Sequence, residues 1–431
     1  MKKVIAVFLS IVMCLSVLGC AFTAFAADKP YPIIYVHGFM AGSIYSGIGT
    51  DEQKSVMAPD NDAIIEAVKG VVPDLFKLFV TKDFDAFLDV LLPAVTELVG
   101  DSFFDENGKA KAGTGRIISR PTAAQIKASY EAGREISFDY DWRYSPVDLA
   151  KELGAFIEQV KAATGRDKVS ISAHSYGNCV TMAYIALDEN NINNLDGYVC
   201  NASAYMGESY TGELLGGDFA FLGDAIINFL KDNVFRGTDL EETGNILCDV
   251  LKLLFVTDAV EENLKFTVSK IQERTVKNLL VRWFGFWPSV WAMVPDEMYE
   301  NCREYIFNDI LADEDCTGLL ATLDEFDSVV RNHKTEIIEK AGTLNHFGVI
   351  SRYNLSKVPV SSNYTVLTDN NIDVKYSSFG ASCSKYGETL PSTYTQALYH
   401  EKNYISPDRM IDASTCMFPQ KTWFVKNMPH S

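Results

Sequence analysis

The sequence lacks an excess of positive charge and any cluster of residues typical of a metal site. Its 431 residues carry 38 lysine and arginine side chains against 57 aspartate and glutamate side chains, which gives a net charge of −19. This balance argues against a nucleic-acid partner and against electrostatic docking on anionic lipid. Because no cysteines and histidines stand at metal-ligand spacing, we predict no structural zinc. No metal site and no cofactor are predicted from the rest of the sequence either, and calcium binding is left open.

A regular cysteine pattern is also missing. Two of the nine cysteines fall within the first 20 residues, and the other seven are scattered along the chain without the spacing of a disulfide framework. In an oxidising compartment Cys302 and Cys316 are a conceivable pair, but the sequence leaves the disulfide pairing open.

The N-terminus contains a long apolar run without a charge, and no such run follows it in the chain. A membrane-spanning segment beyond the N-terminus is therefore not expected. Lys2 and Lys3 precede the apolar run, and the Ala-Phe-Ala at 24–26 resembles a cleavage site. We therefore predict a secretory signal peptide over 1–26 and an exported protein. Loss of its two lysines would change the net charge to −21. An alternative is a lipoprotein anchored through Cys20.

Residues 168–180 contain the strongest functional signal. The alternating apolar residues Val169, Ile171 and Ala173 predict a buried strand, and the chain then turns at Ser175 before a helical pattern begins. Ala173 and Gly177 are small, as a tight strand-to-helix corner requires. A serine on such a bend exposes its hydroxyl above the sheet, which makes Ser175 the candidate nucleophile.

A second signal lies about 130 residues upstream, where the strand-like run 32–36 ends in His37-Gly38. Together with the Ser175 corner, this segment resembles the oxyanion loop of α/β-hydrolase lipases. The resemblance implies that the backbone amides of Phe39 and Tyr176 form the oxyanion hole, each worth on the order of 3 kcal/mol. His37 is interpreted as orienting this loop, and His174 as a packing residue.

The segment 136–143 is predicted to be a strand that ends in Tyr-Asp-Trp-Arg. This tetrad is similar to one in lecithin–cholesterol acyltransferase-like hydrolases, and we interpret Asp141 and Arg143 as an architectural ion-paired corner. Ser145 and Pro146 then predict the start of a helix that returns the chain to the strand before Ser175.

Two stretches with apolar residues at helical spacing, about 60–104 and 210–345, interrupt the predicted sheet. The aromatic segment 283–295 resembles a stretch of the same hydrolases. The inserts form either the core of a helical subdomain or a cap that lines an acyl pocket; the excess of aromatic residues favours the cap.

After the second insert, strands are predicted at 347–353 and 364–367, the latter paired with 373–378 across a hairpin turn. The expected order of a hydrolase triad is serine, acid, histidine. The resemblance to secreted bacterial lipases assigns the acid to the turn 406–414, with Asp408 favoured over Asp412. His430 then follows the strand predicted within 421–430 and is the candidate base. It is the penultimate residue, so this strand has to anchor it.

The sequence therefore predicts an α/β-hydrolase over 27–431, with a mostly parallel sheet and large helical caps. The predicted function is that of a secreted lipase or carboxylesterase cleaving esters of medium to long acyl chains through an acyl-enzyme. The expected partner is an ester or lipid substrate, with transient contact to a lipid interface. The alternatives are a phospholipase or acyltransferase of this fold, or a catalytically silent scaffold that binds lipid or protein. The oligomeric state stays open.

Overall fold

The structure is a computed structural model that describes residues 30–56, 100–218, 276–358 and 363–430, with scattered positions between 81 and 96 and between 227 and 249. The predicted signal peptide with Cys20 lies outside the described residues, as do most of the first predicted insert and a large part of the second.

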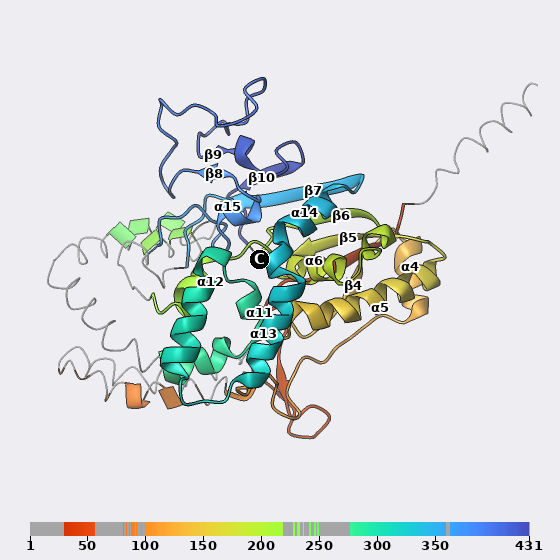
Figure 1. Cartoon of the computed structure of the whole chain (residues 1–431), viewed down its shortest axis with the longest axis vertical. Coiled ribbons are helices and arrows are strands. Elements are labelled where there is room, and N and C mark those ends of the chain that lie inside the picture. The colour runs from red at the N-terminus through yellow and green to blue at the C-terminus, as the bar shows by residue number, and fades with distance from the viewer. Residues whose placement is uncertain are drawn as a thin grey trace, which may run out of the picture.

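A six-stranded sheet forms the centre of the molecule (Figure 1). All its strand pairs are parallel, and the strand order is β10-β7-β6-β5-β1-β4. Parallel strands place their carboxyl ends at one edge of the sheet, where sites of α/β proteins form. The strands are β1 (Ile33–Val36), β4 (Ile136–Phe138), β5 (Val169–His174), β6 (Leu195–Asn201), β7 (His346–Tyr353) and β10 (Thr422–Lys426).

Helices pack on this sheet and connect its parallel strands. The helix α5 (Pro146–Thr164) begins with Ser145 as N-cap and Pro146 at the first turn, as predicted, and ends at Gly165 in the left-handed conformation. It contacts α4 (Ala123–Glu131) and α6 (Gly177–Leu187), which follows the Ser175 corner. The side chains that face the sheet from α5 and α6 are fully buried, so this layer closes the main core.

A second group of helices lies beside the sheet (Figure 1). It consists of α7 (Ser209–Leu215), the π-helical segment η4 (Val276–Gly285), α11 (Pro288–Ala292), α12 (Asp296–Arg303), the π-helical segment η5 (Glu304–Ile310) and α13 (Thr317–Val329). Trp287 and Trp291 are fully buried here and join the main core. The next helix, α14 (Lys334–Gly342), contacts α6 and β7. The insert predicted over 210–345 therefore includes one helix, α14, that packs on the central sheet.

The predicted hairpin forms only at its turn. An isolated antiparallel bridge joins Thr368 to Asp373, and the Val374 amide donates to the Leu367 carbonyl oxygen at 2.9 Å. Residues 364–367 do not form the predicted strand, and the residues after Asp373 form the short helix α15 (Val374–Ser377). Asp369 closes this turn: its Oδ1 accepts hydrogen bonds from the backbone amides of Asn371 and Ile372, at 3.2 and 2.9 Å.

The remaining elements are short. They are β2 (Tyr45–Ser46), β3 (Lys54–Ser55), β8 (Ser382–Cys383), β9 (Ile411–Asp412), η1 (Gly100–Ser102), η2 (Asn191–Asn194), η6 (Arg331–His333) and η7 (Ala413–Thr415). The pairs β2–β3 and β8–β9 are antiparallel and stand apart from the main sheet.

Candidate active site

Ser175 lies at the corner between β5 and α6, in a strained backbone conformation with φ of +54°. A non-glycine residue in this region is uncommon and is held there only by its surroundings. The close approach of the two elements explains the small neighbours: a Cβ added at Gly177 would lie 2.3 Å from the carbonyl oxygen of Val36. The bend presents the Ser175 hydroxyl at the carboxyl edge of the sheet.

His430 lies next to Ser175, with 2.8 Å between its Nε2 and the Ser175 Oγ. The preceding strand β10 is an edge strand of the sheet, and Trp423 on it is 58% exposed, so burial of this strand is not what fixes the histidine. Backbone hydrogen bonds do so instead. The His430 carbonyl oxygen accepts from Arg352 Nη1 at 2.7 Å and is 2.8 Å from His174 Nε2. The histidine near the end of the chain is therefore held in place.

The carboxylate that meets His430 belongs to Asp369. Its Oδ2 lies 2.9 Å from His430 Nδ1, and its carbonyl oxygen accepts from the His430 amide at 2.9 Å. Asp369 is fully buried. Because Nδ1 faces this carboxylate, it carries the proton, and Nε2 is left to accept one from Ser175.

Neither acid predicted for this position contacts His430. Asp408 instead accepts hydrogen bonds from the Tyr353 hydroxyl at 2.9 Å and from Lys426 at 2.8 Å. Asp412 accepts from the Tyr394 hydroxyl at 2.9 Å and from the Ala397 amide at 3.0 Å. The assignment of the acid to Asp408, or to Asp412, is thus corrected to Asp369. The turn 406–412 folds against β8 and the end of β10 rather than against the site.

A signal for Asp369 is present in the sequence. The predicted strand 364–367 ends two residues before it, and an acid that follows a predicted strand is a candidate for the carboxyl edge of the sheet, although the structure forms a turn at 364–366. The hairpin interpretation places 369–372 in a connecting turn and hides this signal. Sequence reasoning also misses Arg352, which has no motif of its own.

The predicted oxyanion donors flank the serine. Phe39 lines the same cavity as Ser175, and Tyr176 directly follows it. Within the described ranges, no hydrogen bond uses the backbone amide of either residue. Gly38 lets the loop come close, because a Cβ at this position would lie 2.8 Å from the Ser175 Cβ. Both amides are therefore available to an oxyanion.

His37 and the Tyr-Asp-Trp-Arg corner support this loop. The His37 ring stacks on Tyr140 with centroids 3.9 Å apart, and the Tyr140 hydroxyl donates to the His37 carbonyl oxygen. Asp141 and Arg143 form the expected ion pair, with 2.6 Å between Oδ2 and Nη2, and the Arg143 side chain is fully buried. The corner has a structural role, since it fixes the backbone under the oxyanion loop.

The site shifts the pKa values of its two histidines in opposite directions. Burial lowers the pKa of His430, but the charge and hydrogen bond of Asp369 outweigh it and raise the value above the ordinary 6.5. Burial and the neighbouring His430 and Arg352 lower the pKa of His174 to about 4. His174 is therefore neutral at pH 7 and donates from Nε2 to the His430 carbonyl oxygen.

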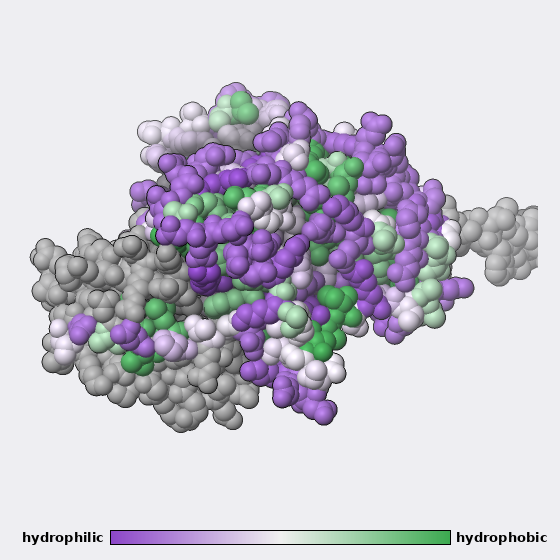
Figure 2. Space-filling view, turned by 60° about the horizontal axis from the view of Figure 1, so that its bottom comes forward, coloured by the Kyte–Doolittle hydropathy of each residue, from purple (hydrophilic) through white to green (hydrophobic). Residues whose placement is uncertain are grey.

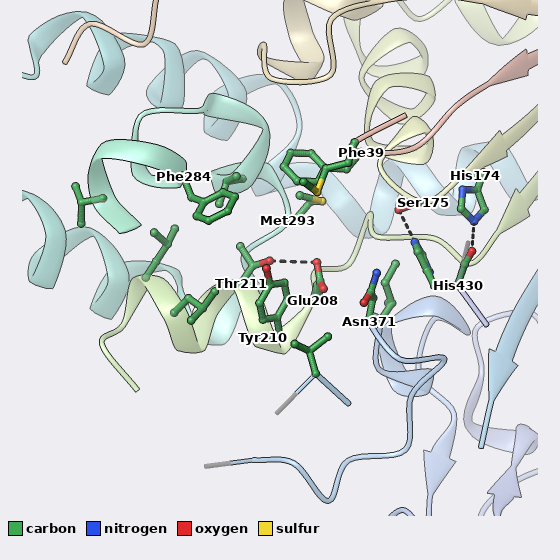
Figure 3. A pocket seen from close by; sticks show the side chains of 17 residues that line it. Phe39, His174, Ser175, Glu208, Tyr210, Thr211, Phe284, Met293, Asn371 and His430 are labelled. Carbon is green, nitrogen blue, oxygen red and sulfur yellow. Dashed lines mark hydrogen bonds between the residues drawn. The ribbon is translucent and has the colours of Figure 1, made fainter. Parts of the chain in front are cut away.

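Ser175 and His430 face a cavity of about 380 Å³ (Figure 3). This volume is within the range of small-molecule pockets. Its walls are largely apolar and come from the oxyanion loop, α7, η4 and the α11 region; they include Phe39, Leu214, Val281, Phe284, Val290 and Met293. The second group of helices thus lines the space in front of the serine.

In the described part of the chain, no group of three or more histidine, cysteine, aspartate or glutamate residues could hold a metal ion. None of the helices found there is long and apolar enough to cross a membrane.

The parallel sheet and the serine on a left-handed bend between β5 and α6 define the class of protein: the chain has the α/β-hydrolase fold. Within that class, residues 107–216 match the family model of lecithin:cholesterol acyltransferase, which confirms the resemblance predicted from the sequence. The matched segment contains the Tyr-Asp-Trp-Arg corner and Ser175, but not Asp369 or His430. A comparison with curated proteins found no match. The family indicates an enzyme that transfers or hydrolyses acyl groups of lipids.

Proposed function

We propose that the protein is a serine hydrolase that cleaves carboxylic esters of medium to long acyl chains through an acyl-enzyme, as a lipase or carboxylesterase does. The observation that carries this proposal is the hydrogen-bonded series Ser175, His430 and Asp369 at the wall of an apolar cavity. A nucleophile, a base and an orienting acid in this arrangement are the elements of acyl transfer.

In the proposed reaction, His430 Nε2 takes the Ser175 proton as Oγ attacks the ester carbonyl carbon. The amides of Phe39 and Tyr176 stabilise the negative charge on the carbonyl oxygen. Protonated His430 then donates its proton to the leaving alcohol, while Asp369 holds the ring and stabilises its cation. A water molecule, activated by the same histidine, cleaves the acyl-enzyme and releases the acid.

The proposal includes export and contact with lipid. The predicted signal peptide over 1–26 supports export. Met40 lines the cavity and is 50% exposed, so it offers an apolar contact at the cavity. Hydrophilic residues cover much of the coloured face shown in Figure 2, with small hydrophobic patches between them. This pattern suits a transient contact with a lipid interface more than permanent insertion.

A fluorophosphonate probe tests the proposal, because it reacts only with an activated serine. We expect stoichiometric labelling at Ser175, located by peptide mass spectrometry, and none in Ser175→Ala. Hydrolysis of p-nitrophenyl esters from two to sixteen carbons should then rise with chain length before it levels off. A folded protein that is neither labelled nor active would reject the hydrolase and leave the silent, lipid- or protein-binding scaffold.

An acyltransferase is the second candidate, and the family match over residues 107–216 favours it. The chemistry differs only in what attacks the acyl-enzyme: an alcohol rather than water. Adding a long-chain alcohol to the ester assay separates the two. If the new ester exceeds the free acid at low alcohol concentration, the protein is a transferase; if free acid dominates, it is a hydrolase.

A further inference from the structure

Glu208 is a buried carboxyl group in the wall of the cavity, and the proposed mechanism gives it no role. It precedes α7 and follows Gly207, whose φ is +117°. A Cβ at position 207 would lie 2.6 Å from Pro295, and the Glu208 amide donates to the Met293 carbonyl oxygen at 2.8 Å. The backbone is therefore fixed, and only 6% of Glu208 is exposed.

The carboxyl group of Glu208 has one hydrogen-bond partner among the described residues. Its Oε2 accepts from the Thr211 hydroxyl at 3.1 Å, whereas Oε1 has no partner there. No lysine or arginine of the described ranges forms an ion pair with it, since the nearby Lys357 pairs with Glu213. A buried carboxyl group without a cation is stable in its neutral form.

The charges that act on Glu208 come from the elements around the site. His430 and the Thr211 hydroxyl favour ionisation, while Asp369 and Asp373 oppose it. Burial is the dominant effect and raises the pKa of Glu208 to about 8. At pH 7 the group is therefore mainly a carboxylic acid. Because Oε2 is occupied by Thr211, the acid proton on Oε1 is free to be donated to a ligand.

The place of Glu208 in the cavity defines what it would bind. In Figure 3 the side chains of Glu208, Tyr210 and Thr211 lie between the apolar end at Phe284 and the reacting groups at Ser175 and His430. A plain hydrocarbon chain along this path would leave the acid proton unpaired, which is unfavourable in a buried site. An uncharged oxygen of the substrate would satisfy it.

We propose that Glu208 is a specificity-determining residue: as a neutral acid it donates a hydrogen bond to an uncharged oxygen that the substrate carries a few bonds from its scissile ester. Such oxygens occur in partial esters of polyols, as a hydroxyl or a second ester group, and in hydroxylated acyl chains. An anionic group at the same place is disfavoured, because Asp369 and Asp373 lie nearby. This inference rests on the proposed hydrolase function and adds its substrate class.

Matched pairs of esters test the inference. One pair is the glycerol monoester and the propyl ester of the same acid; the other is a p-nitrophenyl ester with and without a hydroxyl on the acyl chain. The readout is the ratio of kcat/KM within each pair at pH 7. We expect the oxygen-bearing ester to be preferred about tenfold or more in at least one pair, and Glu208→Leu to abolish that preference. The pair that responds shows whether Glu208 faces the alcohol or the acyl side.

The variant Glu208→Gln separates hydrogen bonding from a purely structural role. Glutamine stays neutral and still donates, so it should keep much of the preference at pH 7. The pH dependence is measured with an oxygen that can only accept, in a p-nitrophenyl ester with and without a methoxy group on the acyl chain, because a hydroxyl could still donate to an ionised carboxylate. Above pH 8 the wild-type preference for the methoxy ester should fall as Glu208 ionises, while that of Glu208→Gln stays constant. Glu336→Gln is the matched control, because Glu336 is exposed on α14 and its replacement should change neither ratio.

The outcomes distinguish this inference from the function on which it rests. A wild type that is not labelled by fluorophosphonate and cleaves no ester contradicts the hydrolase. A wild type that cleaves plain esters, with the same ratios in Glu208→Leu as in the wild type, leaves the hydrolase intact and overturns the role of Glu208. Rates are expressed per labelled Ser175, so partial misfolding of a variant does not affect the ratios.

Discussion

Two acid-bearing turns lie between Ser175 and His430 in the sequence, and they hold their carboxylates in opposite ways. Asp369 is fully buried, with one oxygen on backbone amides and the other on His430. The Asp408 side chain is 22% exposed and binds Lys426 on β10 and Tyr353 at the end of β7. Both turns satisfy the order serine, acid, histidine.

The different contacts of Asp369 and Asp408 indicate a different role for each carboxylate. Among the residues that the structure describes, Asp369 forms an ion pair with His430 alone, so its charge acts mainly on that imidazole. Asp408 is neutralised by Lys426 and ties the edge strand to its neighbour. The first arrangement suits catalysis and the second suits stability. Chain order cannot separate them, whereas substitutions can.

The largest expected effect is that of Asp369→Asn. The amide cannot stabilise the imidazolium or fix the proton on Nδ1, so kcat should fall on the order of 10³- to 10⁴-fold. The measurement is hydrolysis of a soluble p-nitrophenyl ester, with folding checked by circular dichroism. Asp408→Asn and Asp412→Asn are the matched controls, and each should keep kcat within the same order of magnitude. A collapse of kcat in Asp408→Asn with Asp369→Asn active would reverse the assignment.

A smaller effect, on stability, is expected for Asp408→Asn. Burial alone would raise the pKa of Asp408, but Lys426, Ser406 and Tyr353 lower it to about 2 from its ordinary 3.8. A lowered carboxylate pKa stabilises the fold above about pH 4, and this contribution is lost as the pH falls toward 2. At pH 7 the variant should lose about 1–2 kcal/mol of unfolding free energy, because the pair is partly exposed.

Urea denaturation at pH 7 and at pH 3 measures this contribution. The difference between wild type and Asp408→Asn should be clear at pH 7 and shrink at pH 3. An equal difference at both values would mean that the Asp408 charge is not its source, and packing around Tyr353 would then be the cause. Lys426→Met should reproduce the loss at pH 7 if the ion pair is responsible.

The sequence was sufficient to place the strands of the central sheet and the bend at Ser175, although it also predicted a strand at 364–367 that does not form. The buried strands are short apolar runs bounded by turns. The corner at Ser175 is recognisable because the small residues Ala173 and Gly177 stand on either side of it. His430 could also be placed, because it follows the last strand. These features depend on the local sequence pattern, so they can be predicted without knowing the tertiary contacts of each segment.

The acid could not be placed, because its position depends on contacts between distant segments. The Asp369 carboxylate closes its turn by accepting from two backbone amides, and β-strand propensity in the segments beside the turn predicts two strands that do not form. The anchoring of His430 by Arg352 and His174 is likewise a tertiary effect. Glu208 carries no motif, and the bond that fixes its backbone comes from the distant Met293 carbonyl oxygen.

The smallest expected effect is a shift of the acidic limb of the activity profile, and it sharpens the comparison of the two acids. Ester hydrolysis requires neutral His430, whose pKa is raised above 6.5 by Asp369. In the wild type, kcat/KM should therefore be half-maximal above pH 6.5 and fall as the pH decreases. Removing the carboxylate in Asp369→Asn should lower this midpoint by about 1–2 pH units, because an opposite charge in contact shifts a pKa by that amount. Asp408→Asn should leave this midpoint unchanged.

The rate of fluorophosphonate labelling, measured against pH, gives the midpoint even in weakly active variants. An equal shift in both variants would show that the two carboxylates have the same electrostatic effect on His430.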